Sequence, residues 1–156
     1  MDVRRTKEWK RAECMYSELH ATPAFPAFGR PSPKEIEESL QRMLRECPEF
    51  YPARIEVGLH RLVDGAAPSA DKDIEEGFRG MLRLAPRGHL EREVDILVDN
   101  LEKLWRFDLC RTILETLVSS HPRNASFRDS LGHAAARVGA VDEALVHAGK
   151  AVKADP

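Results

Sequence analysis

The sequence lacks any long hydrophobic run and any excess of one charge. No stretch of its 156 residues approaches the roughly 20 consecutive apolar residues that a membrane-spanning helix needs, so we expect no membrane partner. The formal net charge is −2, with 24 basic and 26 acidic residues. Without a general basic field we also expect no nucleic-acid partner.

Cysteine is scarce. Cys14, Cys47 and Cys110 are odd in number and far apart, and no C-x-x-C motif occurs. Such a set argues against a disulfide framework and favours a reducing compartment, so we expect a cytoplasmic protein. We expect each cysteine to be a small core residue and not a reactive thiol.

Motifs that carry chemistry are missing as well. None of the six histidines has H-E-x-x-H or zinc-ligand spacing, and G-x-S-x-G, P-loop and dinucleotide fingerprints are absent. We therefore expect no metal, no cofactor and no enzymatic activity. Asp95 and Asp99 lie four residues apart on one helical face, where a solvated or ligand-facing surface is favoured over acid–base chemistry. A small helical enzyme, or a regulatory module of one, has little support.

The alternation of branched and aromatic residues that is typical of β-strands is also absent. Glycine and proline divide the chain into short segments with helical periodicity. Ser32, Pro33 and Glu35 form a capping-box pattern at the start of one such segment. The short spacers predict that successive helices are antiparallel neighbours. The expected helices cover residues 4–19, 33–46, 49–63, 72–84, 89–104, 107–119, 124–138 and 141–154.

Proline is concentrated in one segment, HATPAFPAFGRPSP, at residues 20–33. Four prolines exclude a helix there, so the segment is expected to be a linker or an extended arm. Phe25 and Phe28 either pin the arm to a groove or pack locally. We therefore divide the chain into residues 1–32, a first helix with a proline-rich arm, and residues 33–156, a helical repeat domain.

Trp105 and Phe107 bracket a tight turn between two expected helices. Two interpretations are open for this aromatic pair. One is a hydrophobic anchor for a partner. We favour the other, in which both rings pack at the helix junction.

The end of the chain carries an internal repeat. Pro122 and Pro156 are separated by 34 residues, and the residues that precede each proline align. The later unit reads Arg128-x2-Leu131-Gly132-x2-Ala135, then Ala144-x3-Ala148, Ala151 and Pro156. The earlier unit reads Val94-x2-Leu97-Val98-x2-Leu101, then Cys110-x3-Leu114, Leu117 and Pro122. Two degenerate units precede them, with an insertion around residues 65–71.

This pattern resembles the tetratricopeptide repeat, whose signature is W-x2-L-G-x2-Y, then A-x3-F and P. The resemblance implies an all-α fold, in which antiparallel helix pairs stack as a short right-handed superhelix, an α-solenoid. One helix pair cannot bury its own apolar stripe, whereas stacked pairs share a continuous core. On this interpretation Leu97, Leu101 and Leu131 are buried.

The resemblance also implies a function. Tetratricopeptide arrays are usually scaffolds that bind a peptide or protein segment in a concave groove lined by the first helix of each pair. The residues expected to face the groove are Glu56, His60, Arg92, Asp95, Asp99, Glu102, Ser126, Asp129 and His133.

The predicted groove set is mostly acidic, which bears on the partner. A variant of the family grips a C-terminal carboxylate with lysine and asparagine side chains, but Asp95 and Asp99 occupy two of the matching positions and would repel a carboxylate. A basic or mixed segment fits the sign better. We therefore predict a non-enzymatic scaffold with a protein or peptide partner.

Three alternatives to this scaffold stay open. The chain could form a homodimer through its uncovered last helix pair or its N-terminal arm. It could also be a regulatory module of a larger protein, or a small chaperone of the tetratricopeptide type.

Overall fold

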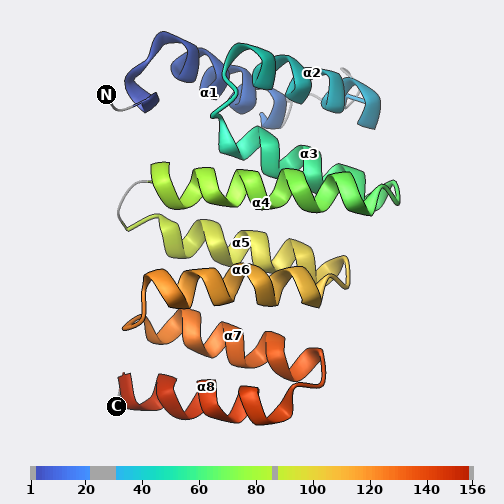
Figure 1. Cartoon of the computed structure of the whole chain (residues 1–156). Coiled ribbons are helices and arrows are strands. Elements are labelled where there is room, and N and C mark those ends of the chain that lie inside the picture. Colours follow the sequence, from blue (N-terminus) through green and yellow to red (C-terminus); the bar gives the residue numbers. More distant parts are fainter. Residues whose placement is uncertain (1–2, 22–30, 86–87, 155–156) are drawn as a thin grey trace. The chain divides into compact units, whose positions relative to one another are not determined.

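The structure, a computed structural model, describes residues 3–21, 31–85 and 88–154, which form eight α-helices and no strand (Figure 1). This confirms the all-α prediction. Residues 22–30, which make up most of the predicted proline-rich arm, lie outside the described residues. The chain divides into two compact units, Met1–Arg87 and Gly88–Pro156.

Each unit is a succession of antiparallel helices (Figure 1), and short turns of three or four residues join the helices from α2 to α4 and from α5 to α8. The first unit begins with a 3-10 turn, Val3–Arg5, and contains α1 (Lys7–His20), α2 (Pro33–Glu46), α3 (Tyr51–Val63) and α4 (Ala67–Leu84). The second unit contains α5 (Leu90–Lys103), α6 (Phe107–Ser120), α7 (Ala125–Arg137) and α8 (Val141–Ala154).

The predicted start of α4 was wrong. Residues 67–71 were expected to lie in an insertion, but α4 begins at Ala67. Pro68 lies in the first turn of the helix, where a missing N–H costs no hydrogen bond. Ala70 N donates to Ala66 O over 3.1 Å, so the helical ladder is already established there. The α3–α4 turn is therefore only residues 64–66.

The start of α2 confirms the predicted capping box. The Ser32 hydroxyl accepts from Glu35 N at 3.3 Å, and the Glu35 carboxylate accepts from Ser32 N at 2.7 Å. The hydrogen bonds from the backbone and hydroxyl of Ser32 lower the pKa of the Glu35 carboxyl. Pro33 occupies the first turn without loss, because its position needs no intrahelical donor.

An aromatic cluster holds α1 against the start of α3. The rings of Trp9 and Phe50 are 4.9 Å apart in an edge-to-face arrangement, and Tyr16 contacts Phe50 at 5.6 Å. Two of these rings belong to an apolar stripe along α1, in which Trp9 and Ala12 are buried and Tyr16 and Leu19 are half-buried. The stripe therefore packs into the first unit along α1 and is most deeply buried at its N-terminal end.

The pair α3–α4 is held together by two reciprocal glycine contacts. A Cβ added to Gly58 of α3 would lie 2.5 Å from Ile74 Cγ1 and 3.0 Å from Ala70 O of α4. In return, a Cβ added to Gly77 of α4 would lie 2.6 Å from Ile55 Cγ1 and 3.0 Å from Ile55 N of α3. Each isoleucine thus occupies the space above a glycine of the other helix, and only glycine permits this approach.

The core of the second unit contains the leucines predicted to be buried. Leu97, Leu101 and Leu131 are no more than 2% exposed, and Phe127 is 1% exposed beside them. At Gly132 an added Cβ would lie 3.3 Å from a backbone carbonyl of α8, so α7 and α8 also approach closely. Burial of these side chains is the main stabilising contribution in the unit.

The cysteines divide between core and surface. Cys47 and Cys110 are buried, as predicted, and burial raises the pKa of the Cys110 thiol to about 12. This thiol is therefore protonated at neutral pH and is a poor nucleophile. The prediction was wrong for Cys14, which is exposed on α1 and lies 3.5 Å from the Glu18 carboxylate.

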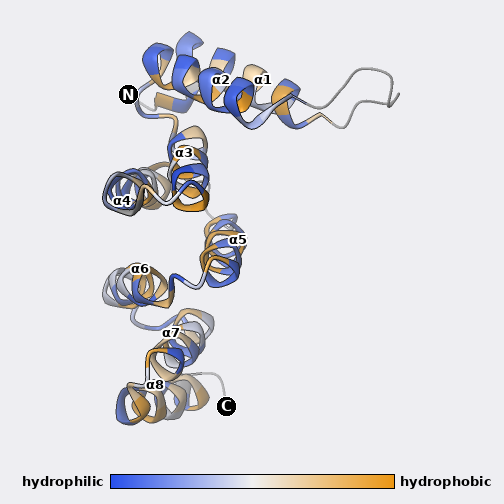
Figure 2. Ribbon diagram, turned by 90° about the vertical axis from the view of Figure 1, so that its right-hand side faces the viewer, coloured by the Kyte–Doolittle hydropathy of each residue, from blue (hydrophilic) through white to orange (hydrophobic). Residues whose placement is uncertain are grey.

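Hydrophilic and hydrophobic residues share each helix of the two units, as Figure 2 shows. Such amphipathic helices bury one face and leave the other to water. None of the described helices combines the length and the apolar character that spanning a bilayer requires.

Candidate functional site

A pocket of about 470 Å³ lies between α5 and α7 in the second unit. It is formed by the first helices of two successive helix pairs, the position in which the repeat pattern places a groove. Its lining residues are Asp95, Val98, Asp99, Glu102, Ser130, His133 and Arg137.

Helical periodicity explains which residues reach the pocket. On α5, Val94, Leu97 and Leu101 are buried, and the pocket residues Asp95 and Glu102 each follow a buried position by one. The pocket side of the helix therefore adjoins the core stripe, and residues three or four apart fall on it together.

The N-terminus of α7 is tied to α5 by one side chain. Asn124 caps α7, since its Oδ1 accepts from Phe127 N at 3.0 Å. The Nδ2 group of the same side chain donates to Glu91 Oε1 on α5 at 2.5 Å. One asparagine side chain thus caps the start of α7 and ties it to α5, the helix that forms the acidic wall of the pocket.

The α5 wall is acidic, and two of its three carboxylates are unpaired. The side-chain carboxylates of Asp95 and Glu102 have no hydrogen-bond or ion-pair partner within the described part of the chain. Asp99 pairs with Lys103 at 2.5 Å, one helical turn later, but both side chains are more than 60% exposed. Such a surface pair contributes little, so Asp99 is available to a ligand at small cost.

The α7 wall carries one imidazole and one guanidinium. His133 Nε2 lies 3.6 Å from an Asp129 carboxylate oxygen. The Arg137 guanidinium stacks over the ring of Phe107, 4.8 Å from its centroid, in a cation–π contact. The pocket can therefore accept cationic groups along α5, while Arg137 is held at its edge.

The structure brings together four of the nine groove residues predicted from the sequence: Asp95, Asp99, Glu102 and His133. Three other predicted residues belong to the same two helices but do not line the pocket. These are Arg92, Ser126 and Asp129, all of them exposed.

The remaining two predicted residues belong to the first unit. The Glu56 carboxylate lies 3.0 Å from His20 Nε2 of α1 and 3.6 Å from His60 Nε2. Glu56 and His60 therefore form a cluster with α1, which the sequence did not predict because His20 is 36 residues away from Glu56.

Sequence reasoning missed three lining residues: Val98, Ser130 and Arg137. Val98 is half-buried between the carboxylates of α5, and Ser130 and Arg137 continue the helical spacing through His133. Extending that spacing by one turn in each direction would have found both α7 residues.

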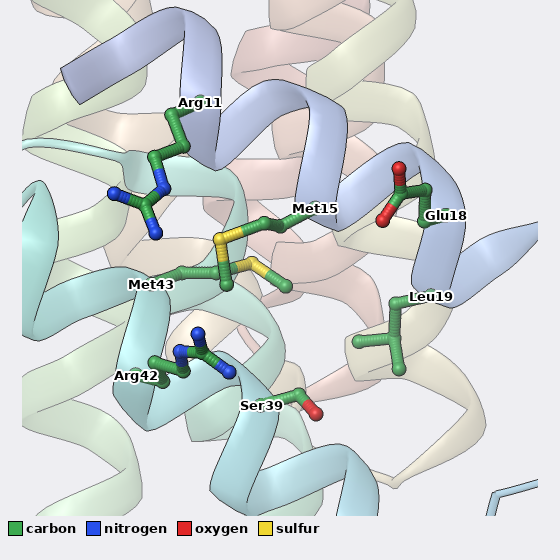
Figure 3. A pocket seen from close by; sticks show the side chains of 7 residues that line it. All are labelled: Arg11, Met15, Glu18, Leu19, Ser39, Arg42 and Met43. Atoms are coloured by element: carbon green, nitrogen blue, oxygen red, sulfur yellow. The ribbon is translucent and has the colours of Figure 1, made fainter.

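A second pocket, of about 440 Å³, lies between α1 and α2 in the first unit. Figure 3 shows Met15 and Met43 extending toward each other across it, with Arg11 and Arg42 on the two helices. Both arginines pair with the Glu46 carboxylate, at 3.1 and 3.7 Å. Its other lining residues are Glu18, Leu19 and Ser39.

The side chains that could ligate a metal ion do not form a metal site in the described residues. Among residues 3–21, 31–85 and 88–154, no group of three histidine, cysteine or acidic side chains is arranged to hold a metal ion.

Trp105 and Phe107, at the α5–α6 turn, were both expected to pack at the helix junction, but only one of them does. Trp105 is 77% exposed, and its backbone adopts a left-handed conformation with φ of 59°. Phe107 is half-buried beneath Arg137, and the two rings meet edge to face at 5.9 Å. Packing at the junction is therefore right for Phe107 and wrong for Trp105.

Two solved structures of MamA resemble this chain. One is MamA from residue 41 to its end, from Desulfovibrio magneticus RS-1, and the other is the MamA RS-1 ArsTM double mutant. Each has a TM-score of 0.50 and 20% sequence identity, over 94% of this chain and 76% of the MamA chain. MamA contains tetratricopeptide repeats, so the likeness supports a tetratricopeptide-like helix-pair fold. No family model and no curated protein matches the sequence.

Proposed function

We propose that the chain is a non-enzymatic protein-interaction scaffold and that the pocket between α5 and α7 binds a basic peptide or protein segment. The observation that carries the proposal is the acidic wall of that pocket, in which Asp95 and Glu102 have no partner within the described residues. An unpaired carboxylate in a concave site is free to accept a lysine or arginine side chain.

The small free energy of an exposed ion pair limits how much the acidic wall contributes to binding. A single exposed pair contributes about 0.2–1 kcal/mol, so three carboxylates supply at most about 3 kcal/mol toward binding. We therefore expect the charges to determine the specificity of binding and the rate of association. The affinity for the bound segment is expected to be moderate. The affinity is then expected to fall with ionic strength, because the carboxylates face solvent.

Selection from a random peptide library against the intact chain tests this proposal. We expect the enriched peptides to be rich in lysine and arginine. Their affinity, measured by calorimetry, is expected to fall about tenfold or more when the salt concentration rises from about 0.05 to 0.5 M. Enrichment of acidic peptides, or of none, would contradict the proposal.

Self-assembly is a second candidate, which the exposed apolar residues of α8 favour. Val141, Leu145 and Val152 are 60–69% exposed and follow helical spacing along one face. Light scattering at increasing concentration distinguishes the two candidates. A chain that stays monomeric at high concentration excludes association through α8 and leaves the pocket as the interaction site.

We further propose that the scaffold acts in a reducing compartment, the cytoplasm. Support comes from Cys14, Cys47 and Cys110, all of which are free thiols. Cys110 in particular packs into the second unit, with its thiol 3.8 Å from Val98 O.

A further inference from the structure

The turns inside three helix pairs share one backbone geometry. The second residue after α3, α5 and α7 is Gly65, Trp105 and Gly139, with φ of 80°, 59° and 83°. The hydrogen bonds repeat as well. The residue that follows each of them donates to a carbonyl five residues earlier, over 2.9 Å in all three turns. Trp105 therefore occupies a position that is glycine in the other two turns.

Tryptophan is the wrong residue for this backbone. A left-handed φ brings the Cβ atom against the neighbouring carbonyl, and for a bulky side chain such a conformation is an outlier. Trp105 is the single non-glycine residue with positive φ in the described part of the chain. Glycine would form the same turn without strain, as it does at residues 65 and 139.

The fold gains little in return for this strain. The Trp105 side chain is 77% exposed, so its burial contributes little to the core. Its ring meets the ring of Phe107, at 5.9 Å between centroids and 88° between ring planes. Strained residues that the fold does not need are found mainly at functional sites.

A series of side-chain contacts links Trp105 to the acidic pocket. Its ring meets the Phe107 ring, the Phe107 ring lies beneath the Arg137 guanidinium, and Arg137 lines the pocket. The residue also follows Glu102, the last acidic residue of the α5 wall, by one helical turn. A segment lying along the carboxylates therefore reaches the exposed indole at the end of the pocket.

We propose that Trp105 is an anchor for the bound segment. A partner that places basic side chains against Asp95, Asp99 and Glu102 also places an aromatic or large aliphatic side chain on Trp105. Tryptophan is suited to this role because it offers a large apolar contact at a low cost in side-chain entropy. This inference rests on the proposed function and specifies the partner: a basic segment with an apolar residue beside it.

Substitution of Trp105 by glycine separates anchoring from folding. Trp105→Gly removes the indole and the strain together, so we expect the melting temperature to rise by about 2–4 °C. The affinity for the basic peptides selected on the wild-type chain is expected to fall about tenfold or more. Trp105→Phe keeps an aromatic ring and is expected to retain affinity within about threefold.

A matched control removes apolar surface elsewhere. Val63, at the end of α3, is 70% exposed, and Val63→Ala is expected to leave peptide affinity unchanged. Fluorescence gives an independent measurement, because Trp9 is buried and Trp105 is exposed. Bound peptide should therefore protect the quencher-accessible tryptophan in the wild-type chain.

Two results would contradict the proposal that Trp105 is an anchor. The first is unchanged affinity in Trp105→Gly; if reversal of the pocket charges still abolishes binding, the scaffold stands and only the anchor is lost. The second is a lower melting temperature together with lower affinity in Trp105→Gly, which would make the tryptophan a structural residue. A selection that enriches no basic peptide removes the proposed function and the anchor together.

Discussion

Replacement of Gly77 by valine is expected to lower the free energy of unfolding of the first unit by about 3 kcal/mol. A single added Cβ would already lie 2.6 Å from Ile55 Cγ1 and 3.0 Å from Ile55 N. The second contact is with backbone, so a rotamer change cannot relieve it and α3 must move. Valine adds two further methyl groups at the same place. Urea unfolding followed by circular dichroism and by the fluorescence of buried Trp9 measures the loss.

The same substitution at Gly149 provides the control. Gly149 also lies within a helix, but an added Cβ would meet no heavy atom within 4 Å. Valine has a higher helix propensity than glycine by about 0.4 kcal/mol, so Gly149→Val is expected to be neutral or slightly stabilising. Equal losses at both positions would show that the close approach of α3 and α4 does not contribute to stability.

A double substitution tests the partner of Gly77 directly. Ile55→Ala removes the Cγ1 atom that an added side chain at residue 77 would strike. The combined variant Gly77→Val/Ile55→Ala is therefore expected to lose less stability than the sum of the single variants, by about 1 kcal/mol or more. Additive losses would place the strain elsewhere.

Reversal of two charges in the pocket is expected to weaken basic-peptide binding about 30- to 100-fold. Asp95→Lys/Asp99→Lys removes two attractions and introduces two repulsions of about 0.5–0.7 kcal/mol each, which together amount to about 2–2.8 kcal/mol. Both side chains are exposed on α5, so folding should be unaffected. Calorimetric titration of the selected peptides against wild type and variant measures the change.

A variant with the same change in net charge controls for the long-range field. Glu13 and Glu38 are exposed on α1 and α2, in the first unit, and Glu13→Lys/Glu38→Lys also adds four charges. We expect this variant to bind with nearly wild-type affinity at physiological salt, where screening limits the field to about 8 Å. If both double variants lose the same affinity, net charge and not the pocket governs binding.

Much of the fold could be predicted because it depends on local signals. Ser32 with Glu35 begins α2, and the spacing of apolar residues in α5 and α7 indicates their buried faces. The start of α4 could not be predicted in this way. Pro68 and its small polar neighbours are typical of a loop, yet proline is equally compatible with the first turn of a helix. The close approach of Gly58 to Ala70, which is buried in this segment, favours the helix.

The site was predicted less completely, for two physical reasons. Helical spacing on α5 indicated the acidic wall, but which α7 residues face it depends on the rotation that Asn124 and Glu91 impose. Trp105 was assigned to the helix junction because large apolar residues are usually buried. The repeat itself held the contrary signal, since Trp105 aligns with Gly139, a position that requires a left-handed backbone.

Mapping a bound basic peptide by backbone amide chemical shifts tests the central claim most directly. The claim is that the pocket between α5 and α7 is the binding surface. It predicts that the largest shifts fall on residues 95–105 and 130–137, with the α1–α2 pocket unchanged. Shifts concentrated on α1 and α2, or spread over both units without a maximum at α5 and α7, would contradict it.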